Sequence, residues 1–164
     1  MSLEIVIWDV NHGNSCAIRF PTGKVMMIDC GSNPLTNFSP ILYTKKYWDL
    51  KYLDYLVISH PHMDHIRDIL NIEHLPPIVL ARPRIDHSVL KEEKNARDLT
   101  VINKYIEIDN AYYSEVLPQN DPYNPSWSGG AEISNYGLTG EQSDFNNYSY
   151  VTFVKYGGFC FASG

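Results

Sequence analysis

Short apolar runs that alternate with polar positions dominate the first sixty residues. The runs at 3–10, 15–20 and 25–28 carry many β-branched residues, and turn residues follow each of them, which predicts three short strands. Their connections are only a few residues long, so we expect an antiparallel meander rather than the opening of a doubly wound parallel sheet. A more continuous apolar run at 55–58 predicts a fourth, buried strand.

Helix signals are more widely spaced. Ser39 followed by Pro40 is typical of a helix N-terminus and predicts a short amphipathic helix that ends near Asp49. Apolar residues at helical spacing predict two further helices, one after residue 65 and one over 98–108.

The remaining segments favour strands and loops. A short strand at 78–82 follows two prolines, which places it near the edge of a sheet. The stretch 118–130 is rich in Pro and Gly and predicts a long irregular loop, in which Trp127 or Tyr123 is a candidate for stacking on a substrate ring. Residues 131–138 are strand-like, and the chain closes with a hairpin that turns at residues 157–158.

Composition and length narrow the class of protein. The 164 residues, with 44% apolar content, predict one domain spanning 1–164. Three Cys without a CxxC pair favour buried, reduced thiols. We find no signal-peptide pattern and no apolar stretch near the ~18 residues of a membrane span, so we expect a cytoplasmic protein without membrane contact. The net charge of −6 does not favour nucleic acid as a partner, although it does not exclude it.

A polar cluster directly after the fourth strand carries the candidate chemistry. Three of the six His in the chain fall within the hexapeptide HPHMDH at 60–65. Alternate residues in an extended segment point the same way, so His60 and His62 can grip one metal ion, while Asp64 and His65 face a neighbouring position. Imidazole nitrogen and carboxylate oxygen are ligands that borderline divalent metals such as Zn²⁺ prefer. A solvated loop that happens to be rich in His is the alternative.

This hexapeptide resembles the signature of the metallo-β-lactamase fold superfamily, whose members are mostly metal-dependent hydrolases. The resemblance implies an α+β fold, an αββα sandwich of mixed, mostly antiparallel sheets with flanking helices. It also implies that His60 and His62 hold metal one. Asp64 and His65 would hold metal two, and Asp64 would have the catalytic role of orienting the attacking water.

Further motifs resemble the ComEC-like branch of that superfamily. They are DVNHGNS at 9–15, PTG at 21–23, IDCG at 28–31 and the NNYSYV segment that begins at Asn146. The resemblance implies that Asp29 supports the ligand loop, because a carboxylate can fix the tautomer of a ligating imidazole. A simple turn-forming Asp is the alternative. His12 stands where the branch has another residue, and we regard His12 and Asn146 as candidate pocket residues.

The resemblance covers this chain but only the first part of the family's domain. In the branch a Gly-Asp pair and a later His complete the metal ligands, and the sequence stops at Gly164 before them. We therefore expect weak occupancy of metal two, and a third ligand for metal one from His12, His87 or water. For His87 itself a solvated side chain is the favoured interpretation. The missing part would leave a sheet face exposed, which favours a homo-oligomer or a completing C-terminal segment.

Two functions of different classes follow from these patterns. The first is a metal-dependent hydrolase that uses a metal-activated water on a phosphodiester or related ester, or on another small-molecule substrate, with one or two Zn and with Mn or Fe as alternatives. The second is a non-catalytic, metal-poor binding domain on the same scaffold. Asn11 and His12 replace a Gly-Gln pair of the branch, and Arg67–Asp68 stand near the place of a Gly pair of the family. Both departures support the second function. The intact hexapeptide supports the first.

Overall fold

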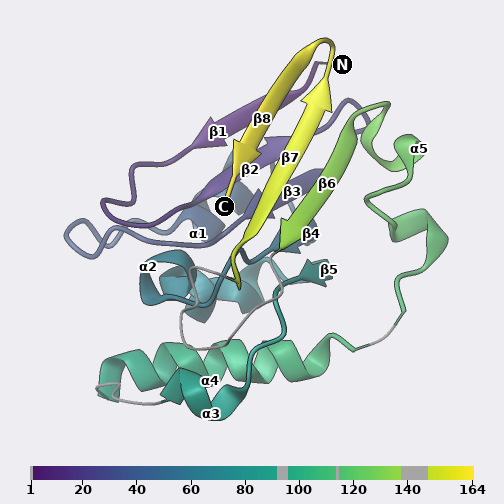
Figure 1. The fold of residues 1–164 in the computed structure, drawn as a ribbon. Helices are drawn as coiled ribbons and strands as arrows, with labels where there is room; N and C mark the ends of the chain where they lie inside the picture. Colours follow the sequence, from purple (N-terminus) through teal and green to yellow (C-terminus); the bar gives the residue numbers. More distant parts are fainter. Residues whose placement is uncertain (1, 92–95, 114, 138–147) are drawn as a thin grey trace.

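The computed structural model describes residues 2–91, 96–113, 115–137 and 148–164. These residues form two packed β-sheets with helices against the far side of the first sheet (Figure 1). The first sheet has the order β1-β2-β3-β4-β5, with strands β1 (Glu4–Ile7), β2 (Cys16–Arg19), β3 (Val25–Ile28), β4 (Leu53–Val57) and β5 (Pro77–Ala81). The second sheet has the order β6-β7-β8, with strands β6 (Glu132–Gly137), β7 (Tyr150–Tyr156) and β8 (Phe159–Ser163).

Along the chain, some helices connect strands of the first sheet, and the others lie between β5 and β6, where the chain passes to the second sheet. The α-helices are α1 (Pro40–Tyr47), α2 (Met63–Ile66), α3 (His87–Lys91), α4 (Ala96–Ala111) and α5 (Pro125–Ser128). Two 3₁₀ helices accompany them, η1 (Arg67–His74) and η2 (Pro118–Asn120). In the part of the chain that the structure describes, no helix is both long and apolar enough to cross a membrane.

Strand direction in the first sheet is mixed. The pairs β1–β2 and β2–β3 are antiparallel, as the meander predicts, whereas β3–β4 and β4–β5 are parallel. The second sheet is antiparallel throughout. The α+β class with mostly antiparallel strand pairing, a mixed first sheet and flanking helices is therefore confirmed. The predicted edge position of the strand after Pro76–Pro77 is also confirmed, because β5 ends the sheet order.

Two apolar cores lie on opposite faces of the first sheet. Successive residues of β3 alternate between them, as the period of a strand requires. Met27 packs with the helices, whereas Met26 and Ile28 pack against the second sheet. Because both faces are covered, β3 and β4 are buried along their whole length. Their ends are thereby held rigidly, and the candidate site begins at those ends.

The stretch 118–130 differs from the predicted irregular loop. It contains η2 and α5, and Asn124 caps α5 through a hydrogen bond from the Ser126 amide. Trp127 is 4% exposed and packs edge-on against Phe20 and Tyr55, so its proposed stacking on a substrate ring is wrong. A large aromatic side chain gains more from filling the core between two sheets than from standing in solvent.

Asp68, which stands near the place of the family's Gly pair, has a structural role. Asp68 is buried, and its Oδ2 accepts hydrogen bonds from Ser39 Oγ and the Ile41 amide, both at 2.8 Å. Asn71 Nδ2 donates to Oδ1. Asp68 therefore caps the first turn of α1 together with the predicted N-cap Ser39. Burial raises the pKa of the Asp68 carboxyl, so an uncharged acceptor would serve the same partners.

We expect Asp68→Ala to lower the free energy of unfolding by about 2 kcal/mol, because it removes a helix cap and leaves buried donors unpaired. Asp68→Asn should cost less than about 1 kcal/mol, because one amide oxygen can accept both bonds at α1 and the Asn71 amide can flip. Urea unfolding of both variants measures the difference. If both variants lose the same free energy of unfolding, the charge of Asp68 matters and its hydrogen-bond acceptors alone do not explain the effect.

Candidate metal centre

The site lies where the parallel strands β3 and β4 end. Parallel strands bring their carboxyl ends to the same edge of a sheet, which is where ligands bind in many open sheets. The Asp29 amide donates to the Val57 carbonyl at 2.8 Å, so Asp29 directly follows β3 beside the end of β4. Ser59 and His60 follow β4, and the Ile58 amide donates to Ala81 of β5. Residues thirty positions apart in sequence meet here.

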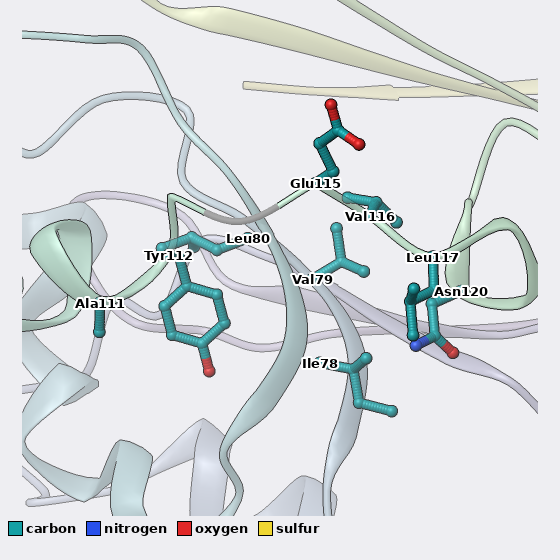
Figure 2. A pocket seen from close by; sticks show the side chains of 9 residues that line it. All are labelled: Ile78, Val79, Leu80, Ala111, Tyr112, Glu115, Val116, Leu117 and Asn120. Atoms are coloured by element: carbon teal, nitrogen blue, oxygen red, sulfur yellow. The ribbon is translucent and has the colours of Figure 1, made fainter.

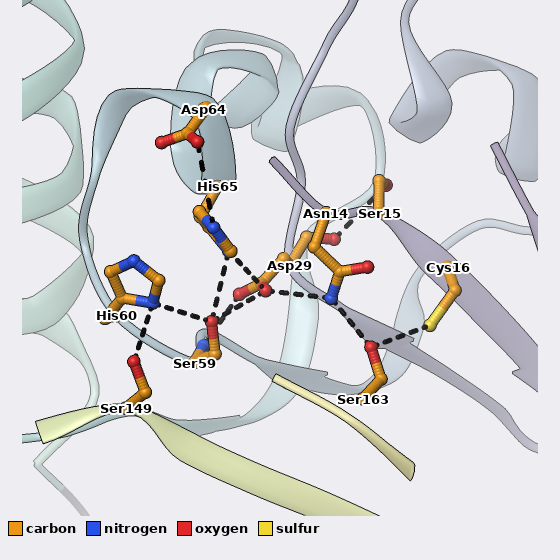
Figure 3. A network of polar contacts seen from close by, with 10 residues as sticks. All are labelled: Asn14, Ser15, Cys16, Asp29, Ser59, His60, Asp64, His65, Ser149 and Ser163. Carbon is orange, nitrogen blue, oxygen red and sulfur yellow. Dashed lines mark hydrogen bonds and ion pairs between the residues drawn. The ribbon is translucent and has the colours of Figure 1, made fainter. Parts of the chain in front are cut away.

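Asp29 is the centre of a polar network in which its fully buried carboxylate accepts hydrogen bonds from three residues (Figure 3). Oδ1 accepts from the Ser59 amide at 2.7 Å. Oδ2 accepts from Ser59 Oγ at 2.7 Å and from Asn14 Nδ2 at 3.1 Å, and it lies 2.8 Å from His65 Nδ1. The backbone of Asp29 has φ of 57°, a left-handed conformation that Asp tolerates better than most residues.

This network assigns the protons of two imidazoles. An ionised carboxylate only accepts hydrogen bonds, so His65 Nδ1 donates to Asp29. Ser59 has a single proton, which it gives to Asp29 2.7 Å away, so its oxygen accepts from His60 Nδ1 at 3.1 Å. Both rings then carry hydrogen on Nδ1, and in its neutral form each presents a lone pair on Nε2. A neutral imidazole with this tautomer is prepared to bind a metal through Nε2.

The surroundings shift the pKa values of His60 and His65 in opposite directions. Burial, together with the neighbouring His65 and His62, lowers the pKa of His60 to about 4. Burial of His65 also disfavours the charged form, but the hydrogen bond to Asp29 and its charge outweigh burial and raise the pKa of His65. His60 is thus neutral at pH 7 and has no proton to lose on binding a cation.

The remaining candidate ligands lie on α2 or directly before it. His62 precedes its first turn, and the amides of His65 and Ile66 both bond to the His62 carbonyl. The ring centroid of His60 lies 4.6 Å from that of His62 and 4.0 Å from that of His65. His65 Nε2 lies 3.9 Å from the carboxylate Oδ2 of Asp64. The four predicted ligands are therefore gathered around one small volume.

Their donor atoms do not yet converge. Among the described residues, no three His, Cys, Asp or Glu side chains are arranged to hold a metal ion as they stand. The chemistry of the donor set nevertheless suits a borderline divalent metal, since three imidazoles and a carboxylate lie together and two rings present Nε2. The Asp64 side chain is 43% exposed, so it can rotate at little cost.

Two glycines set the position of Asp64. A Cβ added at Gly13 or at Gly31 would lie 2.1 Å from the backbone carbonyl oxygen of Asp64, which no side chain can tolerate. The backbone around them is also bonded to the ligand segment, because the Cys30 amide donates to the His65 carbonyl at 2.8 Å. The glycines of the two opening motifs therefore allow close approach of the turn that carries the carboxylate.

We expect Gly13→Ala to weaken divalent-metal affinity by about 10-fold or more, because the new methyl pushes the Asp64 turn out of place. Gly23→Ala is the matched control. Gly13 has φ of 95° and Gly23 has φ of 87°, so both variants carry a similar backbone strain of about 1–2 kcal/mol. A Cβ at Gly23 meets nothing within 4 Å. Calorimetric metal titration of the two variants separates the steric effect from strain. Equal metal affinities would contradict the prediction that the Gly13 methyl displaces the Asp64 turn.

The other residues that the sequence predicts near the site are His12, Asn146 and His87. His12 lies exposed between β1 and β2, and within the described residues no hydrogen bond, ion pair or ring contact joins it to the four candidate ligands. Asn146 lies outside the described residues. His87 begins α3, and its Nε2 lies 2.7 Å from Asp109 Oδ2. The interpretation of His87 as a solvated side chain is therefore correct only in part, because the side chain is 30% exposed while the buried Asp109 carboxylate holds one of its ring nitrogens.

Sequence reasoning missed several residues of the network. Ser59 connects Asp29 to His60, Asn14 reaches Asp29 from the loop before β2, and Ser149 and Ser163 join from the second sheet. Asn14 and Ser149 both lie within motifs that the sequence marks. Their hydrogen-bonding roles carry no local signal, since each depends on a partner far away in the chain.

A groove of about 310 Å³ lies along the edge strand β5 and is separate from this network (Figure 2). Ile78 and Leu80 of β5 line one side, and Tyr112, Val116 and Leu117 line the other. None of the candidate metal ligands lines it. It holds neither a His nor a Cys, so we assign the candidate chemistry to the polar network and not to this groove.

The fold is an α+β arrangement of two packed sheets, with a candidate metal site at the strand ends. The model of the metallo-beta-lactamase superfamily matches residues 8–141. The chain therefore belongs to the metallo-β-lactamase superfamily. A search of curated proteins finds no matching relative.

Solved structures include similar folds. The hydrolase AbOPH, described as in the beta lactamase superfamily, shares 17% identity over 91% of this chain and 54% of its own, with a TM-score of 0.50. The metallo-beta-lactamase fold protein YhfI from Bacillus subtilis shares 14% identity over 98% of this chain and 61% of its own, with a TM-score of 0.48. This chain thus spans a little over half the length of these proteins. At such identities the likeness concerns the fold alone.

Proposed function

We propose that this chain carries the metal-binding part of a metal-dependent hydrolase that uses a metal-activated water. The observation that supports the proposal most directly is the network at Asp29, which holds hydrogen on Nδ1 of His60 and His65 and leaves His65 Nε2 3.9 Å from the Asp64 carboxylate. Membership of the superfamily adds a precedent for metal-dependent hydrolysis.

The residues have distinct roles in this proposal. His60 and His62 would hold one divalent metal, and Asp64 and His65 a second, with zinc as the first candidate and manganese or iron as alternatives. When bound, the metal supplies a Lewis acid that makes water nucleophilic near neutral pH. Asp64 accepts a hydrogen bond from the attacking water and orients it. Asp29 and Ser59 keep the imidazole protons on the nitrogens that face away from the substrate.

A phosphodiester or related ester is the substrate class that we favour. The support is the likeness of the segments at 9–15 and 28–31 to the ComEC-like branch, together with the packing of Gly13 and Gly31 against the ligand turn. The net charge of −6 favours a small phosphodiester over a long nucleic acid.

The first experiment is elemental analysis of protein purified without chelator, followed by metal titration. We expect one or two equivalents of divalent metal in the wild type and a clear loss in Asp64→Ala. Hydrolysis of bis(p-nitrophenyl) phosphate should then depend on metal and stop on addition of a chelator, whereas a β-lactam probe should react more slowly. A folded chain that binds no Zn²⁺, Mn²⁺ or Fe²⁺ would overturn the proposal in favour of a non-catalytic binding domain.

A further inference from the structure

The second sheet reaches the candidate metal centre through one end of its last hairpin. Ser149 directly precedes β7, and Ser163 is the last residue of β8. Ser163 pairs with Thr152 in the sheet register, so the two serines lie at the same end of the hairpin. Figure 3 shows both hydroxyls directed at the network around Asp29. Ser149 reaches it at His60 and Ser163 reaches it at Asn14.

The contact at Ser149 is made to a candidate ligand itself. Ser149 Oγ lies 3.0 Å from His60 Nδ1, and the Tyr150 amide donates to the Ser59 carbonyl at 2.9 Å. Two adjacent residues of the hairpin are thus bonded to two adjacent residues of the ligand segment. His60 is 5% exposed, so its ring has little freedom to find other partners.

The direction of the bond follows from counting protons. Ser59 gives its only proton to Asp29 and accepts from His60 Nδ1. The same N–H also faces Ser149 Oγ, which therefore accepts as well. One N–H is shared between two oxygens at 3.1 and 3.0 Å. Together these acceptors determine both the tautomer of His60 and the plane of its ring.

We propose that Ser149 is a positioning residue for metal binding. It acts through His60, by keeping hydrogen on Nδ1 and turning Nε2 toward the space shared with His62 and His65. This inference rests on the proposed function and deepens it, because it makes the ligand geometry depend on docking of the second sheet. A hairpin that fails to dock leaves His60 with Ser59 as its acceptor.

Ser163 supports the opposite side of the network in the same manner. Asn14 Nδ2 donates to Ser163 Oγ at 2.7 Å and to Asp29 Oδ2 at 3.1 Å. The amide nitrogen of Asn14 is thereby turned toward the carboxylate. The hairpin thus touches the imidazole support at two points, once through His60 and once through Asn14 and Asp29.

A purely structural role for Ser149 predicts different behaviour. In that case the hydroxyl would stabilise the start of β7 and leave the imidazole unchanged. Stability and His60 geometry must therefore be measured separately. The tautomer of His60 can be read from nitrogen-15 chemical shifts of the ring in metal-free protein, which needs neither bound metal nor catalysis.

The test compares Ser149→Ala, Ser149→Cys and Ser149→Thr with the wild type. Alanine removes the acceptor, and cysteine nearly keeps its size but accepts weakly, so both should shift His60 toward a mixture of tautomers. Both should also weaken Zn²⁺ affinity by about 10-fold, the lower end for residues that support a ligand. Threonine keeps the hydroxyl and should restore both properties. Ser134→Ala is the control, since Ser134 lies on β6 and pairs with Phe153, away from the network.

Two results would overturn the inference. One is an unchanged His60 tautomer in folded Ser149→Ala and Ser149→Cys. The other is a loss of Zn²⁺ affinity that Thr fails to restore. A wild type that binds no metal would refute the proposed function instead, while the tautomer measurement would still decide whether Ser149 positions His60.

Discussion

Asp64→Ala will abolish metal-dependent hydrolysis and leave the fold intact. The carboxylate is 43% exposed and contacts the other candidate ligands through His65, so removing it leaves no buried group unpaired. The change in unfolding free energy should stay within about 0.5 kcal/mol, as for other surface substitutions. Metal affinity should fall by more than about 100-fold, since residues that only support a ligand already account for 10–100-fold.

The control for this variant is Glu115→Ala, which removes an exposed carboxylate that lines the separate groove beside β5 (Figure 2). It should bind metal and hydrolyse substrate as the wild type does. His62→Ala should also weaken metal binding and hydrolysis, because it removes one of the three candidate imidazole ligands. If folded Asp64→Ala hydrolyses as fast as the wild type, the catalytic assignment is wrong.

Asp29→Asn will reduce both stability and metal binding. An amide has one acceptor, whereas the carboxylate accepts at both oxygens, and either orientation turns an N–H group toward existing donors. With the oxygen toward the Ser59 amide, the Asn N–H₂ group faces His65 Nδ1. The His65 proton is then expected to move to Nε2, which blocks the nitrogen that would bind metal.

We expect this variant to lose about 3 kcal/mol of unfolding free energy, because buried donors lose a charged acceptor. Metal affinity should fall by about 100-fold. Asn tolerates the left-handed backbone at this position, so strain does not add to the effect. Urea unfolding and calorimetric titration measure the two quantities.

Asp54→Asn is the matched control for Asp29→Asn. Asp54 is another buried carboxylate in the first sheet, and it accepts from the Val25 amide at 2.9 Å and from Lys24 Nζ at 2.7 Å. It lies in β4, toward the end opposite the ligand segment. Its replacement should lower stability by about 1 kcal/mol and leave metal affinity unchanged. A similar loss of affinity in both variants would mean that general destabilisation, and not the tautomer of His65, explains the result.

Much of the local structure could be predicted because its causes are local. Ser39 and Pro40 start α1 as expected, since a cap and a fixed φ act within one turn. The three opening strands appear as predicted, although the first two are shorter at their ends and only the third keeps its predicted bounds. The long segment after the candidate ligands was less predictable, because η1 replaces the expected α-helix and only α2 is α-helical.

The sequence by itself determined the set of candidate ligands, because His60, His62, Asp64 and His65 lie within six residues and need only one strand end and one turn to come together. It also indicated the fold class, through the resemblance of the hexapeptide and the opening motifs to a known superfamily. Only the tertiary structure decided how those ligands are supported. The contact between Asp29 and Ser59 depends on parallel pairing of β3 with β4.

The contact between Ser149 and His60 joins residues that are even further apart in the sequence, and it depends on the packing of the two sheets. The burial of Trp127, the capping of α1 by Asp68 and the contact of Gly13 with the Asp64 turn have the same origin. Each joins segments whose separation in sequence carries no local pattern. Periodicity and spacing predict neighbours along the chain, whereas the hydrogen bonds that orient the imidazoles arise between strands and sheets that meet only on folding.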